Sequence, residues 1–246
     1  MEILYLILIG FIAGAINTLA GGGSLLTLPM LIFLGLPPTV ANGTNRIAIL
    51  IQNIFGTAGY KSKGISSYPY SLYLGISALF GAIIGAQIAV DIKGELFNKI
   101  LAVVMVMVVV FIIAKPKKFK NLPERLSRKH IWLGIIIFFF IGIYGGFIQA
   151  GTGFLILMAL TSINHFSLIK SNAAKTLVVL IYSISALATF AYYGKVDWLY
   201  GFSLAIGGAT GAWFASRWSV KKGDNLIKVF LIVVVIIMAV KLWFFD

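Results

Sequence analysis

Two basic side chains stand inside long apolar stretches of this sequence, each close to an asparagine. Arg46 follows Asn42 by four residues and Lys175 follows Asn172 by three, so helical spacing puts each pair on one face of a helix. A cation at membrane depth costs about 2.5–3.5 kcal/mol and usually faces a cavity or an ion path. We therefore expect both pairs to bind an anion. The alternative is that the two cations extend to the lipid headgroups.

Glycine clusters interrupt two other apolar stretches, at Gly21–Ser24 and at Gly151–Gly153. A helix that breaks at membrane depth exposes backbone N–H groups, and the next helix begins with its positive dipole end, which attracts anions. The hydroxyls of Ser24 and Thr152 add donors at both breaks. Close packing of helices is the alternative explanation, since small residues are common where membrane helices meet.

These considerations give two sets of candidate residues. We expect the anion to be bound by Gly21, Gly22, Gly23, Ser24, Asn42, Asn45, Arg46, Gly151, Thr152, Gly153, Asn172 and Lys175. We expect its path to be lined by Asn17, Gln52, Asn53, Gln149, Thr176, Tyr182 and Ser183. Most of the polar residues in both sets repeat at helical spacing, as expected for stripes along single helix faces.

The positions of the acidic residues and the histidines argue against hydrolytic catalysis and against metal binding. The chain has only seven acidic residues, and all fall in expected loops or near the ends of the chain. A serine nucleophile at Ser24 would lack a histidine base within the same apolar segments. With no cysteine either, the sequence predicts no metal site, no cofactor and no catalytic residue, and hence a protein that is not an enzyme.

The composition places these residues in a membrane. Hydrophobic residues make up 60% of the 246 residues and charged residues 11%, against about 25% charged in soluble domains. The net charge is +13, and seven of the 20 lysines and arginines crowd a short linker at 115–130, which the positive-inside rule places in the cytoplasm. The expected partners are the bilayer and a small anionic substrate, not nucleic acid. A homodimer is left open.

The chain repeats itself at an offset of 130 residues. The offset brings Gly21 onto Gly151, Asn42 onto Asn172, Gly64 onto Gly194 and Gly81 onto Gly211. We therefore divide the chain into a first transmembrane repeat at 1–114, the linker at 115–130 and a second repeat at 131–246. Internal repeats of this kind are typical of transporters.

Eight apolar stretches fill the two repeats. They span about 3–35, 38–60, 70–90, 96–114, 131–163, 167–193, 198–218 and 226–245. The first and fifth are too long for one crossing helix of about 20 residues, so each is expected to form a helix, a glycine break and a short second helix. Five helices per half is an odd number, which predicts an all-α membrane protein with two inverted repeats.

The motifs around the first break resemble a known family of membrane permeases. Ala20–Gly23, Gly35–Pro38 and Ala41–Arg46 are similar to the first signature of the TauE/SafE sulfite-exporter family. The segment 145–160 is similar to its second glycine motif. The resemblance implies outward transport of small sulfur-containing oxyanions, such as sulfite or organosulfonates, across the cell (inner) membrane.

One departure from the family pattern bears on coupling. Position 17, often acidic in such relatives, is Asn17 here, which favours a route driven by the membrane potential alone. Two alternatives remain: a passive small-anion channel, and a carrier for a different organic anion.

Overall fold

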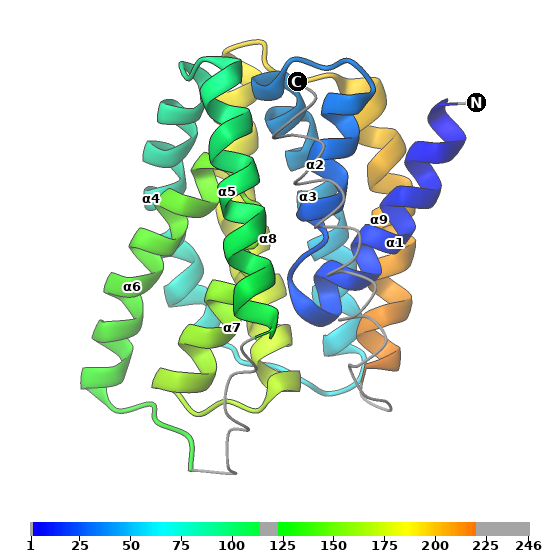
Figure 1. The fold of residues 1–246 in the computed structure, drawn as a ribbon. Coiled ribbons are helices and arrows are strands. Elements are labelled where there is room, and N and C mark those ends of the chain that lie inside the picture. The colour runs from blue at the N-terminus through cyan, green and yellow to red at the C-terminus, as the bar shows by residue number, and fades with distance from the viewer. Residues whose placement is uncertain (1, 114–122, 220–246) are drawn as a thin grey trace.

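The described chain is a bundle of helices (Figure 1). The structure, a computed structural model, describes residues 2–113 and 123–219. Its helices are α1 (Glu2–Ala20), α2 (Ser24–Phe33), α3 (Pro38–Lys61), α4 (Tyr70–Val90), α5 (Gly94–Ile113), α6 (Arg128–Phe147), α7 (Thr152–Ile163), α8 (Leu168–Tyr192) and α9 (Trp198–Trp218). The expected apolar stretch 226–245 and residues 115–122 of the expected linker lie outside the described residues. Residues 128–130, the end of that linker, belong to α6.

Both long apolar stretches break where the glycines predict. α1 ends at Ala20 and α2 begins at Ser24, while α6 ends at Phe147 and α7 begins at Thr152. The ten residues of α2 extend about 15 Å, half the thickness of a bilayer core. Figure 1 shows α1 descending from the top and α2 returning there, whereas α6 rises from the bottom and α7 returns to the bottom.

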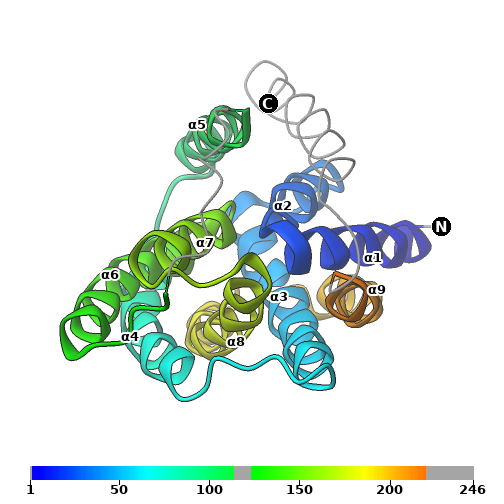
Figure 2. The ribbon, with the colours of Figure 1, turned by 90° about the horizontal axis from the view of Figure 1, so that it is seen from below.

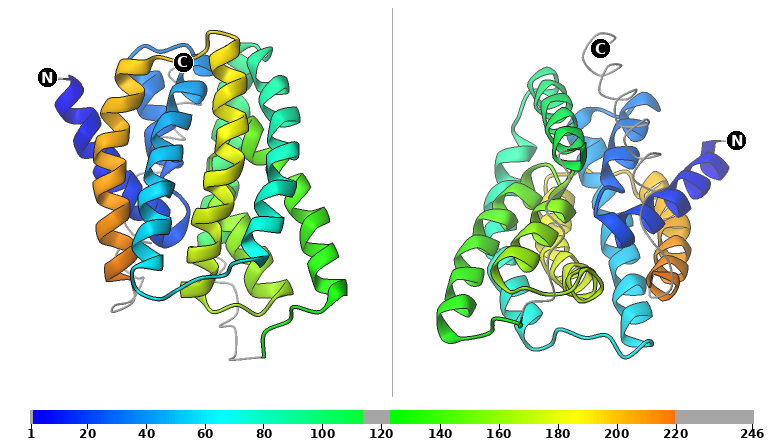
Figure 3. Two further views of the ribbon diagram at one scale, coloured as in Figure 1. Left: turned by 180° about the vertical axis from the view of Figure 1, so that it is seen from behind. Right: turned by 60° about the horizontal axis from the view of Figure 1, so that its bottom comes forward.

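Two long helices, α3 and α8, form the centre of the bundle. They pack against each other, with α9 and α1 on one side and α4 and α6 on the other (Figure 2). α3 also packs on α9 and α8 on α4, so each half contributes helices to both sides. The view from behind in Figure 3 shows α3 and α8 running through the height of the molecule. The polar stripes predicted on 38–60 and 167–193 therefore lie on the two central helices.

Glycines bring the outer helices into backbone contact. A Cβ added to Gly10 would meet the carbonyl oxygen of Leu204 in α9, and one added to Gly142 would meet that of Ala78 in α4. Small residues permit such close approach of membrane helices, and the same device occurs in both halves. α1 is thereby held on α9 and α6 on α4.

The two glycines that the sequence offset pairs, Gly81 and Gly211, both lie at contacts of this kind. A Cβ on Gly81 would meet the carbonyl oxygen of Phe139 in α6, and one on Gly211 would meet that of Phe11 in α1.

Burial is distributed as in a membrane protein rather than a soluble one. Phe140 and Phe214 are 63% and 64% exposed, while Arg46 and Lys175 are 0% and 1% exposed. Four described helices, α1, α4, α6 and α8, are long and apolar enough to cross a membrane. α3 has a comparable length but carries the polar stripe, which faces the interior.

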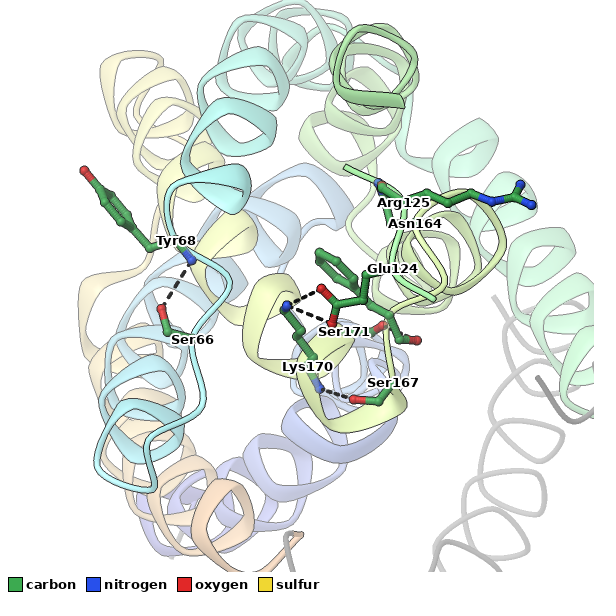
Figure 4. A network of polar contacts seen from close by, with 9 residues as sticks. Ser66, Tyr68, Glu124, Arg125, Asn164, Ser167, Lys170 and Ser171 are labelled. Atoms are coloured by element: carbon green, nitrogen blue, oxygen red, sulfur yellow. Dashed lines mark hydrogen bonds and ion pairs between the residues drawn. The ribbon is translucent and has the colours of Figure 1, made fainter. Parts of the chain in front are cut away.

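The end of the linker is attached to the loop between α7 and α8 (Figure 4). Glu124 forms an ion pair of 2.6 Å with Lys170, whose ammonium lies 4.6 Å from the ring centre of Phe166. The backbone N–H of Arg125 donates to the carbonyl of Asn164 at 3.0 Å, and the Asn164 amide donates back to the Arg125 carbonyl at 3.0 Å. These contacts position the start of the second half.

Candidate functional site

The two helix breaks touch each other. A Cβ on Gly21 would lie 2.6 Å from the Cα of Gly153, and one on Gly153 would overlap the Cα of Gly21. Gly21 and Gly151 have φ of +84° and +73°, a region that glycine adopts without strain. Gly21 and Gly153 therefore lie in direct backbone contact, and the two breaks are packed together in this arrangement.

Arg46 of α3 binds the carboxyl end of α6. Its Nη1 donates to the carbonyl of Gly145, and its Nη2 donates to the carbonyl of Gly146 at 2.8 Å and to Asn42 Oδ1 at 3.0 Å. The Asn42 amide donates to the carbonyl of Phe147 at 2.7 Å. The last carbonyls of a helix lack intrahelical partners and carry the negative end of its dipole, so a cation is stabilised there.

Lys175 of α8 binds the carboxyl end of α1 in the same way. Its Nζ donates to the carbonyls of Asn17 at 2.7 Å and Thr18 at 3.1 Å and to Asn172 Oδ1 at 2.6 Å. The Asn172 amide donates to the Leu19 carbonyl at 3.0 Å. Each half therefore supplies the cation that caps the broken helix of the other half. Both cations are buried and hydrogen-bonded inside the bundle, which excludes the headgroup alternative.

Gln149 lies at the second break and connects four helices. Its backbone carbonyl accepts from the hydroxyls of Thr152 at 2.7 Å and Ser24 at 3.3 Å. Its side-chain oxygen accepts from Arg46 Nη1 at 2.9 Å and from the Tyr182 hydroxyl at 3.0 Å. The two hydroxyls expected to face an anion are thus engaged with the backbone in this closed arrangement.

Other predicted residues lie in the same interior without joining these two clusters. Asn45 Oδ1 accepts from Thr27 at 2.7 Å, and Asn53 donates to the carbonyl of Ile49 in its own helix at 2.7 Å. The hydroxyl of Thr176 donates to the Ala173 carbonyl at 2.9 Å. The atoms Asn45 Nδ2, Gln52 Nε2 and Ser183 Oγ are buried without a hydrogen-bond partner among the described residues.

The remaining two glycines serve the first break. A Cβ on Gly23 would lie 2.6 Å from the Cβ of Asn17, so this glycine lets α2 return close to α1. The carbonyl of Gly22 accepts from the N–H of Leu25 at 3.1 Å, which begins α2.

Sequence reasoning missed the groups that hold the cations. They are backbone carbonyls of 17–18 and 145–146, which no side-chain pattern reveals. It also missed Tyr60, whose hydroxyl donates to the Thr18 carbonyl at 3.3 Å. One available signal was the position of each break, because a helix that ends inside a membrane needs donors for its last carbonyls.

Neither buried cation forms an ion pair with a carboxylate of the described residues. A helical bundle with an apolar surface, broken helices and buried charges at their meeting point has the features of a membrane transport protein. The chain belongs to the sulfite exporter TauE/SafE family, whose model matches residues 6–242. It is a membrane transporter of that family.

Curated relatives cover nearly the whole chain. A probable membrane transporter protein, ORF9, of Sinorhizobium sp is 26% identical over 97% of this chain and 91% of its own length. The probable membrane transporter protein YfcA of Escherichia coli K12 is 28% identical over 96% and 88%. YunE of Bacillus subtilis, also named a probable membrane transporter protein, is 24% identical over 88% and 87%. No solved structure gives a significant match.

Proposed function

We propose that this protein is a permease that exports small sulfur-containing oxyanions, such as sulfite or organosulfonates, through a central cationic site. The observation that carries the proposal is the pair of buried cations, Arg46 and Lys175. They are at most 1% exposed and have no carboxylate partner among the described residues. Positive charge that is held at membrane depth by helix ends rather than by carboxylates favours an anion as the passing species. The name of the family supplies the sulfur oxyanion.

The site lies between two inverted repeats, 1–114 and 131–246. In support, the described helices occur in the same order in both halves, with long α1 and α6 followed by short α2 and α7. The two broken hairpins enter from opposite ends of the bundle (Figure 1). Transport then proceeds by movement of the halves against each other, which separates the two breaks and exposes the cations alternately.

The binding residues belong to the clusters around the two cations and the two breaks. Asn42 and Asn172 orient the cations, while the N-terminal ends of α2 and α7 supply backbone donors once the breaks separate. Gln52 Nε2 and Ser183 Oγ have no hydrogen-bond partner within residues 2–113 and 123–219, which suits side chains that line the path of a polar solute in another conformation.

The linker and the ends of α3 and α9 face the cytoplasm. The last turn of α3 carries Lys61 and the last turn of α9 carries Arg217. Both helix ends lie at the same end of the bundle as the start of α6 and the described residues 123–127 before it (Figure 1). The positive-inside rule assigns this end to the cytoplasm. A membrane potential that is negative inside then drives an anion outward by about 2.3 kcal/mol per charge per 100 mV, so export needs no coupling ion.

The test is sulfite flux into proteoliposomes at a set membrane potential. We expect saturable flux with counterflow exchange, reduced at least about thirtyfold by Arg46→Ala, because losing a buried charged contact costs about 2 kcal/mol or more. Arg46→Lys keeps the charge but loses the planar guanidinium, so we expect its flux to lie between those of the wild type and Arg46→Ala. Lys99→Ala is the control, since Lys99 forms only an exposed pair with Glu95.

Three results would contradict the proposal. Flux without saturation or counterflow would indicate a channel. Transport of a carboxylate but of no sulfur oxyanion would indicate a different organic anion. Equal flux in the wild type and in folded Arg46→Ala would show that transport does not use the central cationic site.

A further inference from the structure

We infer that the side-chain oxygen of Gln149 occupies the position of a substrate oxygen, and that the transported anion displaces it from Arg46 and Tyr182. The inference rests on the proposed function and specifies its binding step. It assigns the direct contact with the anion to Arg46, and it makes Gln149 a residue that sets affinity.

The surroundings of Gln149 Oε1 are those of an anion oxygen. It accepts from a guanidinium N–H at 2.9 Å and from a phenol hydroxyl at 3.0 Å. Gln149, Arg46 and Tyr182 are 3%, 0% and 0% exposed, so these groups are shielded from bulk solvent. Two convergent buried donors on one oxygen form the kind of pocket that binds an oxyanion.

Arg46 has donor capacity that the protein leaves available. Its hydrogen bonds to the carbonyls of Gly145 and Gly146 hold the end of α6. Its hydrogen bond to Asn42 lies within α3. Among the hydrogen bonds that Arg46 forms with the described residues, the one to Gln149 joins it to a side chain of the other half. The Gln149 side chain is able to rotate away without breaking a helix. Its Nε–H is buried without a hydrogen-bond partner in the described part of the chain, a cost of about 1–3 kcal/mol that an incoming acceptor relieves.

An anion has an energetic advantage over the amide it replaces. The guanidinium already makes a charge-assisted hydrogen bond to the neutral amide, and an anionic oxygen adds the attraction between opposite charges at a buried site. When no substrate is bound, the Gln149 amide oxygen accepts the hydrogen bonds of Arg46 and Tyr182. A charged substrate oxygen then takes its place. A neutral solute would gain nothing by the exchange, which favours anions selectively.

Lys175 lacks this property. All three of its N–H bonds are used, two on carbonyls of α1 and one on Asn172 of its own helix. A substrate would have to break the cap of α1 to reach it. Lys175 therefore stabilises the broken helix and contributes its charge to the site from a distance.

The test compares Gln149→Glu, Gln149→Ala and wild type in the sulfite flux assay. Gln149→Glu places a carboxylate permanently on Arg46 and Tyr182, and we expect transport to fall at least about tenfold because the tethered anion competes with the substrate. Gln149→Ala removes the competitor, and we expect KM to fall about threefold or more. Ser66→Glu, which adds a carboxylate at an exposed loop position between α3 and α4, is the control for added charge.

A thermal-shift measurement in detergent separates blocking from misfolding. We expect Gln149→Glu to be folded, with a melting temperature at least that of wild type, and to lose the stabilisation that sulfite gives wild type. A folded Gln149→Glu with wild-type KM, or a Gln149→Ala with unchanged or raised KM, would overturn the inference while Arg46-dependent flux left the proposed function standing. Absence of wild-type flux for every anion would overturn both.

Discussion

Gly21 and Gly153 lie in direct backbone contact, although 132 positions separate them in the sequence, and a Cβ on Gly21 would be 2.6 Å from the Cα of Gly153. The contact joins the break of the first half to the break of the second. The break that ends each capped helix therefore touches the break of the opposite half.

Gly153→Ala is expected to destabilise the closed arrangement. The added methyl would overlap the backbone of Gly21, and overpacking of this kind costs about 1–3 kcal/mol. The apparent melting temperature in detergent should fall by several degrees. Gly94→Ala is the control, because its Cβ would be 3.4 Å from the nearest atom, the Pro38 ring, an ordinary contact. Equal melting temperatures for the two variants would contradict the closed contact.

Asn172→Ala should destabilise the protein more than Asn53→Ala. Loss of the Asn172 amide leaves one N–H of Lys175 and the carbonyl of Leu19 unpaired, at about 1–3 kcal/mol per buried group. Asn53 donates only to Ile49 within α3, so its removal frees one weak local contact. Thermal unfolding of both variants measures the difference. An equal loss would show that the contact between halves adds nothing.

Single cysteines should report opposite sides of the membrane for Lys63→Cys and Lys93→Cys. Both residues are exposed, Lys63 beyond α3 and Lys93 beyond α4, at opposite ends of the bundle (Figure 1). The chain has no cysteine of its own, so each substitution gives one labelling site. With an impermeant maleimide on intact cells, we expect label at position 93 and none at position 63. The reverse pattern would invert the proposed orientation.

Asn164→Ala should loosen the end of the linker far more than Lys170→Ala. Asn164 is 1% exposed; it accepts from Tyr70 at 3.0 Å and donates to the Arg125 carbonyl at 3.0 Å. The ion pair of Lys170 with Glu124 is partly exposed, and such pairs contribute about 0–1 kcal/mol (Figure 4). Limited trypsin cleavage after Arg125 should accelerate in Asn164→Ala and change little in Lys170→Ala. Similar rates in both variants would assign the attachment to the ion pair instead.

Much of the local structure follows from the sequence. The helix breaks lie at the glycines, α3 begins at Pro38, and Ser167 caps α8 by accepting from the N–H of Lys170 at 3.2 Å. Gly64 and Gly194, matched by the repeat offset, both have positive φ, at 73° and 64°. These features depend on backbone preferences and short-range hydrogen bonds, which residue types reveal directly.

The placement of charge was also readable, because polar side chains in apolar segments must face away from lipid. The sequence located the stripes of Asn42, Arg46, Asn172 and Lys175, and all four side chains are buried. It did not reveal that these cations hold the ends of opposite helices or that Gln149 engages Arg46. Whether each broken hairpin re-enters or fully spans the membrane was likewise open from the sequence.

The sequence by itself determined where the helices break and which side chains avoid lipid, since glycine flexibility and the cost of burying charge are properties of individual residues. Only the tertiary structure decided the partners of those charges. Every residue carries a carbonyl, so no residue type marks the ones that lack a partner at a helix end. Which of them Arg46 and Lys175 reach depends on how α3 and α8 pack against the hairpins of the opposite halves.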